Sequence, residues 1–261
     1  NLKKKIEIFR TDCLPPDQSV VHYDSIGGAS VHLDNKLYVS IGAPTNTSQK
    51  IRDLSQNDNS YYGKIISINK NSISQFLIDQ TELDVSIYSK GHRNPQGLET
   101  INNKIFSSEH GPKGGDELNV IIEKGNYGWP VASYGNKYEN LNSAAYKLNH
   151  LKNGFVEPLY QFTPAVAISD LVKCTNQLIE YYERNGCLLA TSLRDQSLII
   201  FLLSENLDRV IGIEKIDFGQ RLRHIAKKYN GETFSELDGS IFISSDHAGF
   251  KLKENIKSFL I

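Results

Sequence analysis

Short runs of alternating apolar and polar residues recur along the chain, each preceded by turn residues. Residues 34–42 read DNKLYVSIG, 102–111 read NNKIFSSEHG and 238–249 read DGSIFISSDHAG, with a looser copy, NGCLLAT, at 185–191. Asn, Asp and Gly tolerate positive φ and join antiparallel strands tightly, and alternation at every second residue is typical of strands. The pattern therefore predicts one strand in each copy, entered through a turn and left through Ser or Thr.

The order of these features favours a β-propeller. The copies start at residues 34, 102, 185 and 238, a spacing that four-stranded units with loops of unequal length would produce. The alternative is an ordinary β-sandwich whose hairpins look alike by chance. The propeller is preferred because turn, strand and polar exit keep the same order in every copy.

Other segments complete the expected all-β fold. Apolar runs bounded by turns predict further strands at 63–69, 117–123 and 197–203. The best helical candidate is 170–185, although its apolar residues form no clean stripe. With 261 residues the chain can bury a core of its own, and residues 1–261 are predicted to form a single domain.

Composition narrows the classes of partner. Hydrophobic residues make up 39% and charged residues 23% of the chain, as in water-soluble globular domains. The 29 basic and 30 acidic residues nearly cancel, which argues against a bulk electrostatic interaction with nucleic acid. The longest apolar run, 198–203, is far too short to span a membrane, and the start NLKKKIEIFR has no apolar stretch of a signal peptide.

Three cysteines, Cys13, Cys174 and Cys187, cannot all pair with one another. Cys174 and Cys187 could bridge a hairpin-sized loop, but Cys is often simply buried, so free buried thiols are expected.

The segment 107–130, SSEHGPKGGDELNVIIEKGNYGWP, combines glycines with acidic residues. Glycines allow a chain to turn so that carbonyl oxygens converge, and carbonyl and carboxylate oxygens are the ligands that Ca²⁺ prefers. A flexible loop with solvated acids is the alternative. Upstream, Arg93 and Asn94 within GHRNPQGL offer rigid donors to a carboxylate or carbonyl of a ligand. The alternative is an ordinary hairpin turn in which the arginine forms a salt bridge.

GHRNPQGLE, EHGPKGGDELN and GNYGWP, in this order and spacing, resemble the soluble quinoprotein sugar dehydrogenases. These are the glucose/sorbosone and aldose sugar dehydrogenases, which use pyrroloquinoline quinone (PQQ). The resemblance implies a six-bladed β-propeller of four-stranded antiparallel blades that carries PQQ and Ca²⁺ on one face. It also implies oxidation of an aldose to its lactone, an external electron acceptor, and a periplasmic or secreted location. Family members have a longer N-terminal segment, so at least one blade is expected to be missing from this sequence.

The same resemblance assigns the site residues. It implies Ca²⁺ bound by the main-chain carbonyls of Gly111 and Pro112, and a second, structural Ca²⁺ at Asp116, Glu117 and Tyr127. It further implies that PQQ is held by Arg93, Asn94, Arg194, Arg221 and Arg223. Planar guanidinium forks suit the three carboxylates of PQQ, and Arg221 and Arg223, two apart on a strand, point to one face.

The catalytic base is the least determined residue. Alignment without gaps places Asp24 where the family has its catalytic histidine, whereas His22 lies two residues earlier. Imidazole suits the task because its ordinary pKa of about 6.5 is near working pH. Ser25–Gly28 could absorb the two-residue shift in chain position that brings His22 into place, so His22 is predicted to be the base.

The alternative function is that of a binding module, a propeller that kept the scaffold but lost catalytic turnover.

Overall fold

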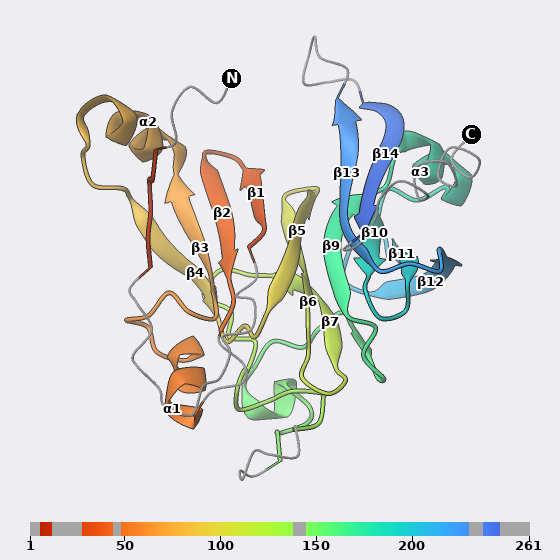
Figure 1. Ribbon diagram of the computed structural model, residues 1–261, viewed down its shortest axis with the longest axis horizontal. Helices are drawn as coiled ribbons and strands as arrows, with labels where there is room; N and C mark the ends of the chain where they lie inside the picture. Colours follow the sequence, from red (N-terminus) through yellow and green to blue (C-terminus); the bar gives the residue numbers. More distant parts are fainter. Residues whose placement is uncertain (1–5, 12–27, 44–47, 138–144, 230–236, 246–261) are drawn as a thin grey trace.

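The computed structural model describes residues 6–11, 28–43, 48–137, 145–229 and 237–245 (Figure 1). This part of the protein contains three four-stranded sheets and one two-stranded sheet, all antiparallel, in which neighbouring strands follow each other in chain order. The first sheet consists of β1 (Ser30–Leu33), β2 (Lys36–Ile41), β3 (Lys64–Asn69) and β4 (Val85–Lys90). The second consists of β5 (Pro95–Ile101), β6 (Lys104–Glu109), β7 (Asp116–Ile121) and β8 (Tyr160–Phe162).

The third sheet consists of β9 (Ile168–Lys173), β10 (Cys187–Ser192), β11 (Ser197–Leu203) and β12 (Val210–Asp217). The last two strands, β13 (Leu222–Tyr229) and β14 (Leu237–Ser245), pair with each other. The helical elements are short: α1 (Gln49–Arg52), η1 (Asp53–Ser55), α2 (Lys70–Asp79), η2 (Leu151–Asn153) and α3 (Asn176–Tyr182). None of the helices in the described part of the chain has the length and apolar character that crossing a membrane requires.

The hairpin turns form where the sequence places Asn and Asp. Leu33 pairs with Lys36 across the turn between β1 and β2, and Ile101 pairs with Lys104 across the turn between β5 and β6. Asp34, Asn102 and Asn103 have positive φ, which these side chains tolerate better than most and which tight two-residue hairpins require.

The repeated sequence unit occupies equivalent strands. Its copies form β2, β6, β10 and β14, each the second strand of its sheet in chain order, which confirms the predicted equivalence. The further strands predicted at 63–69, 117–123 and 197–203 are confirmed as β3, β7 and β11. The predicted helix at 170–185 is wrong in its first part, which belongs to β9, and right in its second part, which forms α3. The prediction failed there because the apolar residues counted toward the helix are buried residues of strand β9.

Successive sheets pack face to face as the blades of a propeller do. The first strands of neighbouring sheets lie against each other, β1 on β5, β5 on β9 and β9 on β13. Each pair of sheets encloses its own core. Tyr38 and Ile65 of the first sheet meet Leu98 and Ile105 of the second. Because sheets cover both of its faces, β10 is buried at all six positions. Burial of one large apolar side chain stabilises the fold by about 1.5–3 kcal/mol.

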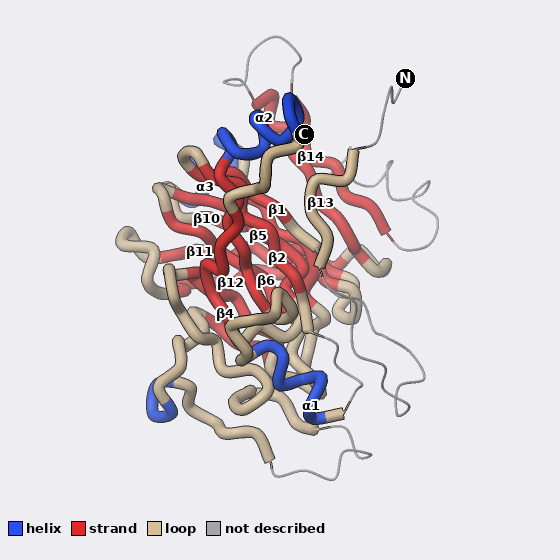
Figure 2. The backbone as a smooth tube through the Cα atoms, turned by 90° about the vertical axis from the view of Figure 1, so that its left-hand side faces the viewer, coloured by secondary structure: helices blue, strands red, loops and turns tan. Residues whose placement is uncertain are grey.

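The remaining interfaces are built in the same way. Phe106 of the second sheet packs with Phe201 of the third, and Leu189 of the third packs with Leu222 and Ile225 of β13. Figure 2 shows the strands gathered in the middle of the molecule, with α1 at one end and α2 at the other. The described residues therefore form a β-propeller architecture; that the propeller has six blades stays a prediction.

Cys174 and Cys187 form a disulfide, so the expectation of free thiols is wrong. Their Cα atoms lie 5.3 Å apart, and Cys174 N–H donates to the carbonyl oxygen of Cys187. The intervening residues contain α3 and return the chain from β9 to β10, which brings the two cysteines face to face. A typical contribution of a disulfide closing a loop of this size is about 3 kcal/mol.

Candidate functional site

The connections that carry most of the predicted site residues lie at one end of the sheets. Because consecutive strands are antiparallel, all connections from an even-numbered strand to the next strand share this end. Besides the long connection from β2 to β3, they include residues 91–94, 110–115, 163–167, 193–196 and 218–221. The hairpin turns β1–β2 and β5–β6 lie at the opposite end, the upper one in Figure 1. The fold thus gathers segments that are distant in the sequence.

Arg93 and Asn94 are buried against the segment that leads to Gly111. Arg93 Nη1 donates to the carbonyl oxygen of His110 at 2.8 Å, and His110 N–H donates to the carbonyl oxygen of Asn94 at 3.1 Å. The Arg93 guanidinium also lies over the Trp129 ring, 5.4 Å from its centroid. The two segments that the sequence singled out are therefore in direct contact.

The buried Glu109 side chain also connects the Arg93 segment with the segment that leads to Gly111. One of its carboxylate oxygens accepts a hydrogen bond from Arg93 N–H, and the other lies 3.0 Å from His92 Nδ1. His92 is fully buried, lies 2.8 Å from Ser89 Oγ through Nε2, and stacks on Tyr127. Sequence reasoning assigned no role to Glu109 or His92, although both stand inside the quoted motifs.

The Gly111–Pro112 segment curls tightly. A Cβ atom at Gly111 would lie 2.2 Å from the carbonyl oxygens of both Gly114 and Gly115, so no larger residue fits without moving backbone. Gly114 and Gly115 have φ of 97° and 69°, values that favour glycine. The glycines of this motif thus create a turn in which main-chain carbonyl groups crowd together.

Asp116 holds this turn to the next connection. One carboxylate oxygen accepts from Gly111 N–H at 3.0 Å; the other accepts from the N–H groups of Val166 and Ile168 at 3.0 and 3.2 Å. Burial raises the pKa of Asp116, while these main-chain donors act in the opposite direction. Arg194 joins the same network, because its N–H donates to the carbonyl oxygen of Val166 at 3.0 Å.

The arginines predicted to hold PQQ differ in exposure. Arg194 and Arg221 are exposed, whereas Arg223 is half-buried and lies close enough to influence the His110 imidazole. Leu222 between the pair is buried and begins β13, so Arg223 lies on the strand and Arg221 directly before it. That the two arginines share one face stays a prediction.

His110 is a buried, neutral imidazole in this region. Burial, and then the positive charge of Arg93, lower the pKa of His110 to about 4, while a hydrogen bond to the main chain of Ile168 acts against them. Its Nε2 atom is buried and makes no hydrogen bond within the described structure. The neutral ring could therefore form a hydrogen bond with a ligand through Nε2 without adding positive charge.

A pair of buried acids lies beside these loops. Glu109 and Glu117 are directly opposite each other on β6 and β7, and with His110 and Gly111 they line a cavity of about 10 Å³. Burial, and then the charge of Glu109, raise the pKa of Glu117 well above its ordinary value. A divalent cation fits such a pair chemically, because it would compensate two carboxylates that are costly to bury.

The other predicted ligands of the second cation have internal partners. Tyr127 hydroxyl donates to the carbonyl oxygen of Val120 at 2.5 Å and accepts from Ile122 N–H at 3.0 Å. Both carboxylate oxygens of Asp116 accept main-chain hydrogen bonds, as described above. In the described part of the chain, no three His, Cys, Asp or Glu side chains are arranged to hold a metal ion. The assignment of Asp116, Glu117 and Tyr127 to a second cation therefore stays a prediction.

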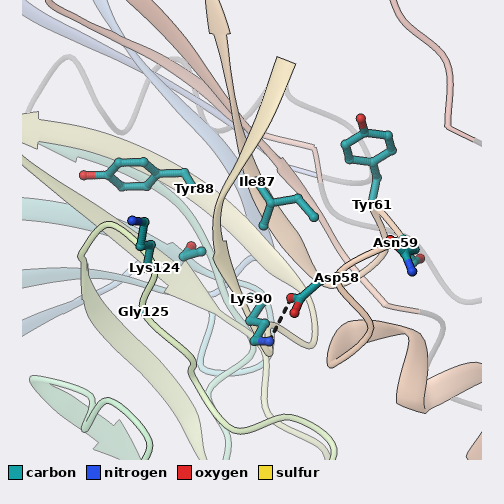
Figure 3. Close-up of a pocket in the computed structure, with 10 residues that line it drawn as sticks. Asp58, Asn59, Tyr61, Ile87, Tyr88, Lys90, Lys124 and Gly125 are labelled. Atoms are coloured by element: carbon teal, nitrogen blue, oxygen red, sulfur yellow. Dashed lines mark hydrogen bonds and ion pairs between the residues drawn. The ribbon is translucent and has the colours of Figure 1, made fainter. Parts of the chain in front are cut away.

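A larger cavity, of about 650 Å³, lies elsewhere (Figure 3). Lys90 and Asp58 form an ion pair of 2.8 Å in it, and Tyr88 and Lys124 lie together on its other side. None of the predicted site residues lines it. His22 and Asp24, the two candidates for the base, lie outside the described residues, so their prediction stays open.

Sheets that pack like propeller blades, with a polar site on the loops at one end, define a β-propeller protein with a candidate binding site on one face. Comparison with known proteins identifies its family. The family model described as glucose/sorbosone dehydrogenase matches residues 2–247. The chain therefore belongs to the glucose/sorbosone dehydrogenase family. It is 27% identical over 224 residues to the aldose sugar dehydrogenase YliI of Escherichia coli, covering 82% of this chain and 57% of that protein.

Solved structures agree with this assignment. A glucose dehydrogenase structure has a TM-score of 0.67 and 26% identity, covering 92% of this chain and 64% of that one. The PQQ-bound aldose sugar dehydrogenase of Streptomyces coelicolor has a TM-score of 0.50 and 25% identity, covering 73% and 48% of the two chains. The chain thus spans between about half and two thirds of the length of these relatives.

Proposed function

We propose that the protein is a quinoprotein sugar dehydrogenase that oxidises an aldose to its lactone with PQQ and Ca²⁺. The observation that carries the proposal is the hydrogen bond between Arg93 Nη1 and the His110 carbonyl oxygen. It joins the Arg93–Asn94 pair to the Gly111–Pro112 turn, the two features expected to bind the cofactor and its cation. Family membership and the PQQ-bound relative support the same function.

The residues of this chain that would hold the cofactor have suitable chemistry. Arg93, Arg194, Arg221 and Arg223 offer planar donors to carboxylates, and Asn94 offers an amide. Carbonyl oxygens of the Gly111–Pro112 turn are hard ligands suited to Ca²⁺. When bound, PQQ supplies the quinone that accepts two electrons from the sugar.

A base must take the proton of the sugar hydroxyl while the anomeric carbon loses hydride. We assign this role to His22, with Asp24 as the alternative. His110 does not compete for the role, because its lowered pKa leaves the ring a poor proton acceptor at neutral pH. Its neutral ring is better suited to accept a hydrogen bond from a bound ligand.

The second cation of the proposal rests on Glu117. Burial and the charge of Glu109 raise its pKa despite a hydrogen bond from Asn119, so the charged carboxylate is costly in this place and a cation would relieve that cost. Asp116 instead organises the turn through its three main-chain donors.

The Cys174–Cys187 disulfide supports a periplasmic or secreted location, because disulfides persist mainly in oxidising compartments. There the reduced cofactor would be reoxidised by an external electron acceptor. We also propose six blades for the complete propeller, following the family that the motifs resemble.

The proposal is tested by adding PQQ with and without Ca²⁺ to the purified chain. We expect uptake that depends on Ca²⁺, seen as quinone absorbance retained after gel filtration, followed by reduction of an artificial acceptor with an aldose. Uptake without sugar oxidation would favour a binding module, whereas absence of uptake at saturating Ca²⁺ would overturn both forms of the proposal.

A further inference from the structure

Glu109 has an arrangement that its place in a glycine-rich motif does not explain. It is the last residue of β6, is only 4% exposed, and directs both carboxylate oxygens toward the β4–β5 connection rather than toward solvent. One oxygen binds Arg93 N–H and the other binds His92 Nδ1. The carboxylate therefore holds two consecutive residues of a segment that belongs to a different sheet connection.

His92 extends this contact into the first sheet. A carboxylate only accepts hydrogen bonds, so Nδ1 of His92 carries a proton, and Nε2 lies 2.8 Å from Ser89 Oγ at the end of β4. One face of the ring stacks on Tyr127 with centroids 4.5 Å apart. Both nitrogens and one face of the ring are thus engaged, which leaves the imidazole a single orientation.

The main chain repeats the connection one residue further along. His110 N–H donates to the Asn94 carbonyl oxygen, and Arg93 Nη1 donates to the His110 carbonyl oxygen. With the two bonds of Glu109, these fix the position of Arg93 both through its backbone and through its guanidinium. The residue that follows His110 is Gly111, where the cation-binding turn begins.

We infer that Glu109 and His92 are positioning residues that set the placement of Arg93 and Asn94 relative to the Gly111–Pro112 turn. Neither needs to touch the cofactor: Glu109 acts through the Arg93 amide, and His92 orients Glu109. This inference rests on the proposed function, since the property that it governs is the affinity for PQQ in the presence of Ca²⁺. Outer partners of this kind typically change affinity about 10- to 100-fold when they are altered.

The test compares Glu109→Gln with Glu99→Gln, a matched control. Glu99 on β5 also uses both carboxylate oxygens to accept main-chain hydrogen bonds, but they come from Thr100 and from Lys173 of the third sheet. The dissociation constant of PQQ at saturating Ca²⁺ is measured by equilibrium dialysis, and the unfolding midpoint in urea is measured without PQQ.

We expect both variants to lose stability, but only Glu109→Gln to bind PQQ more weakly, by about 10- to 100-fold, under conditions where both remain folded. Unchanged PQQ affinity in folded Glu109→Gln overturns the inference alone. Failure of the wild-type chain to bind PQQ overturns the proposed function, and this inference with it, so the two failures are distinguishable.

A second pair of variants serves if Glu109→Gln does not fold. His92→Gln keeps an N–H donor for Glu109, whereas His92→Leu has a similar volume and no donor. We expect affinity for PQQ close to wild type in His92→Gln and roughly tenfold weaker in His92→Leu, in line with the effect of outer partners. Equal affinity in the two variants overturns the role assigned to His92.

Discussion

Arg93 Nη1 donates to the main-chain carbonyl oxygen of His110 at 2.8 Å, although the two residues belong to different connections between strands. The bond holds the guanidinium beside the segment that leads into the Gly111–Pro112 turn. It also orients the carbonyl group of the residue directly before Gly111. An arginine at this place therefore shapes the site as well as carrying charge.

The first prediction concerns this arginine. Arg93→Lys keeps the charge but loses the planar fork, so a lysine cannot serve His110 and a ligand carboxylate with the same geometry. Loss of one hydrogen bond to a charged group corresponds to about 1.5–3 kcal/mol, so PQQ affinity is expected to fall roughly 10- to 100-fold. The control is Arg184→Lys, an exposed arginine at the opposite end of the sheets. Equal affinity in the two variants would contradict the prediction.

The second prediction concerns the turn. Gly111→Val places a side chain where carbonyl oxygens lie 2.2 Å from the position of Cβ, so the turn must open. Ca²⁺-dependent PQQ uptake, measured by calorimetric titration, is expected to fall more than in Glu109→Gln or Asp116→Asn. At Gly28 a Cβ meets nothing within 4 Å, so Gly28→Ala is the control and is expected to bind as the wild type does. Equal loss in the Gly111, Glu109 and Asp116 variants would count against the prediction.

The third prediction concerns pH. Glu117 has a raised pKa in the folded state, so the folded protein retains this proton longer than the unfolded chain. Its contribution to stability is complete at low pH, below the ordinary pKa of 4.5, and is lost as pH rises through the raised value. In the absence of Ca²⁺, Glu117→Gln should gain stability relative to wild type as pH rises, as urea unfolding between pH 5 and 8 would show. A constant difference across that range would refute this role of Glu117.

Calcium should reverse that trend, which is the fourth prediction. If a cation binds at Glu117, the carboxyl must release its proton, so binding strengthens as pH rises. Ca²⁺ is therefore expected to raise the thermal unfolding temperature of the wild type more at pH 8 than at pH 5. Glu117→Gln should lose most of this increment. An equal increment in both proteins would place the cation elsewhere.

The fifth prediction concerns the base. His22→Ala should bind PQQ with Ca²⁺ as the wild type does but lose sugar oxidation by about 10²- to 10⁴-fold, the usual contribution of a general base. Asp24→Asn should retain most of the activity. The opposite result in steady-state assays would assign the base to Asp24.

Much of the fold follows from residues that are close together in the sequence. Alternating positions in Lys36–Ile41 and Lys104–Glu109, with Asn and Asp at the turns, specify hairpins because strand period and turn conformation depend on neighbouring residues. The motifs around Arg93 and Gly111 could also be identified from the sequence, because each consists of neighbouring residues. The sequence also placed Arg221 and Arg223 at the start of a strand, and the structure begins β13 at the buried Leu222 between them.

Only the tertiary structure decided which of these segments meet. Asp116 stands in an acidic, glycine-rich segment of the sequence, but only the structure shows that its carboxylate accepts N–H groups from Val166 and Ile168, about fifty residues away. Cys174 and Cys187 are paired because β9 and β10 return to the same place after α3. The roles of Glu109 and His92 were hidden likewise, since a buried polar group takes its partner from whichever chain segment packs beside it. Periodicity and turn chemistry are local properties that a sequence displays, whereas these partners are set by how whole sheets pack against one another.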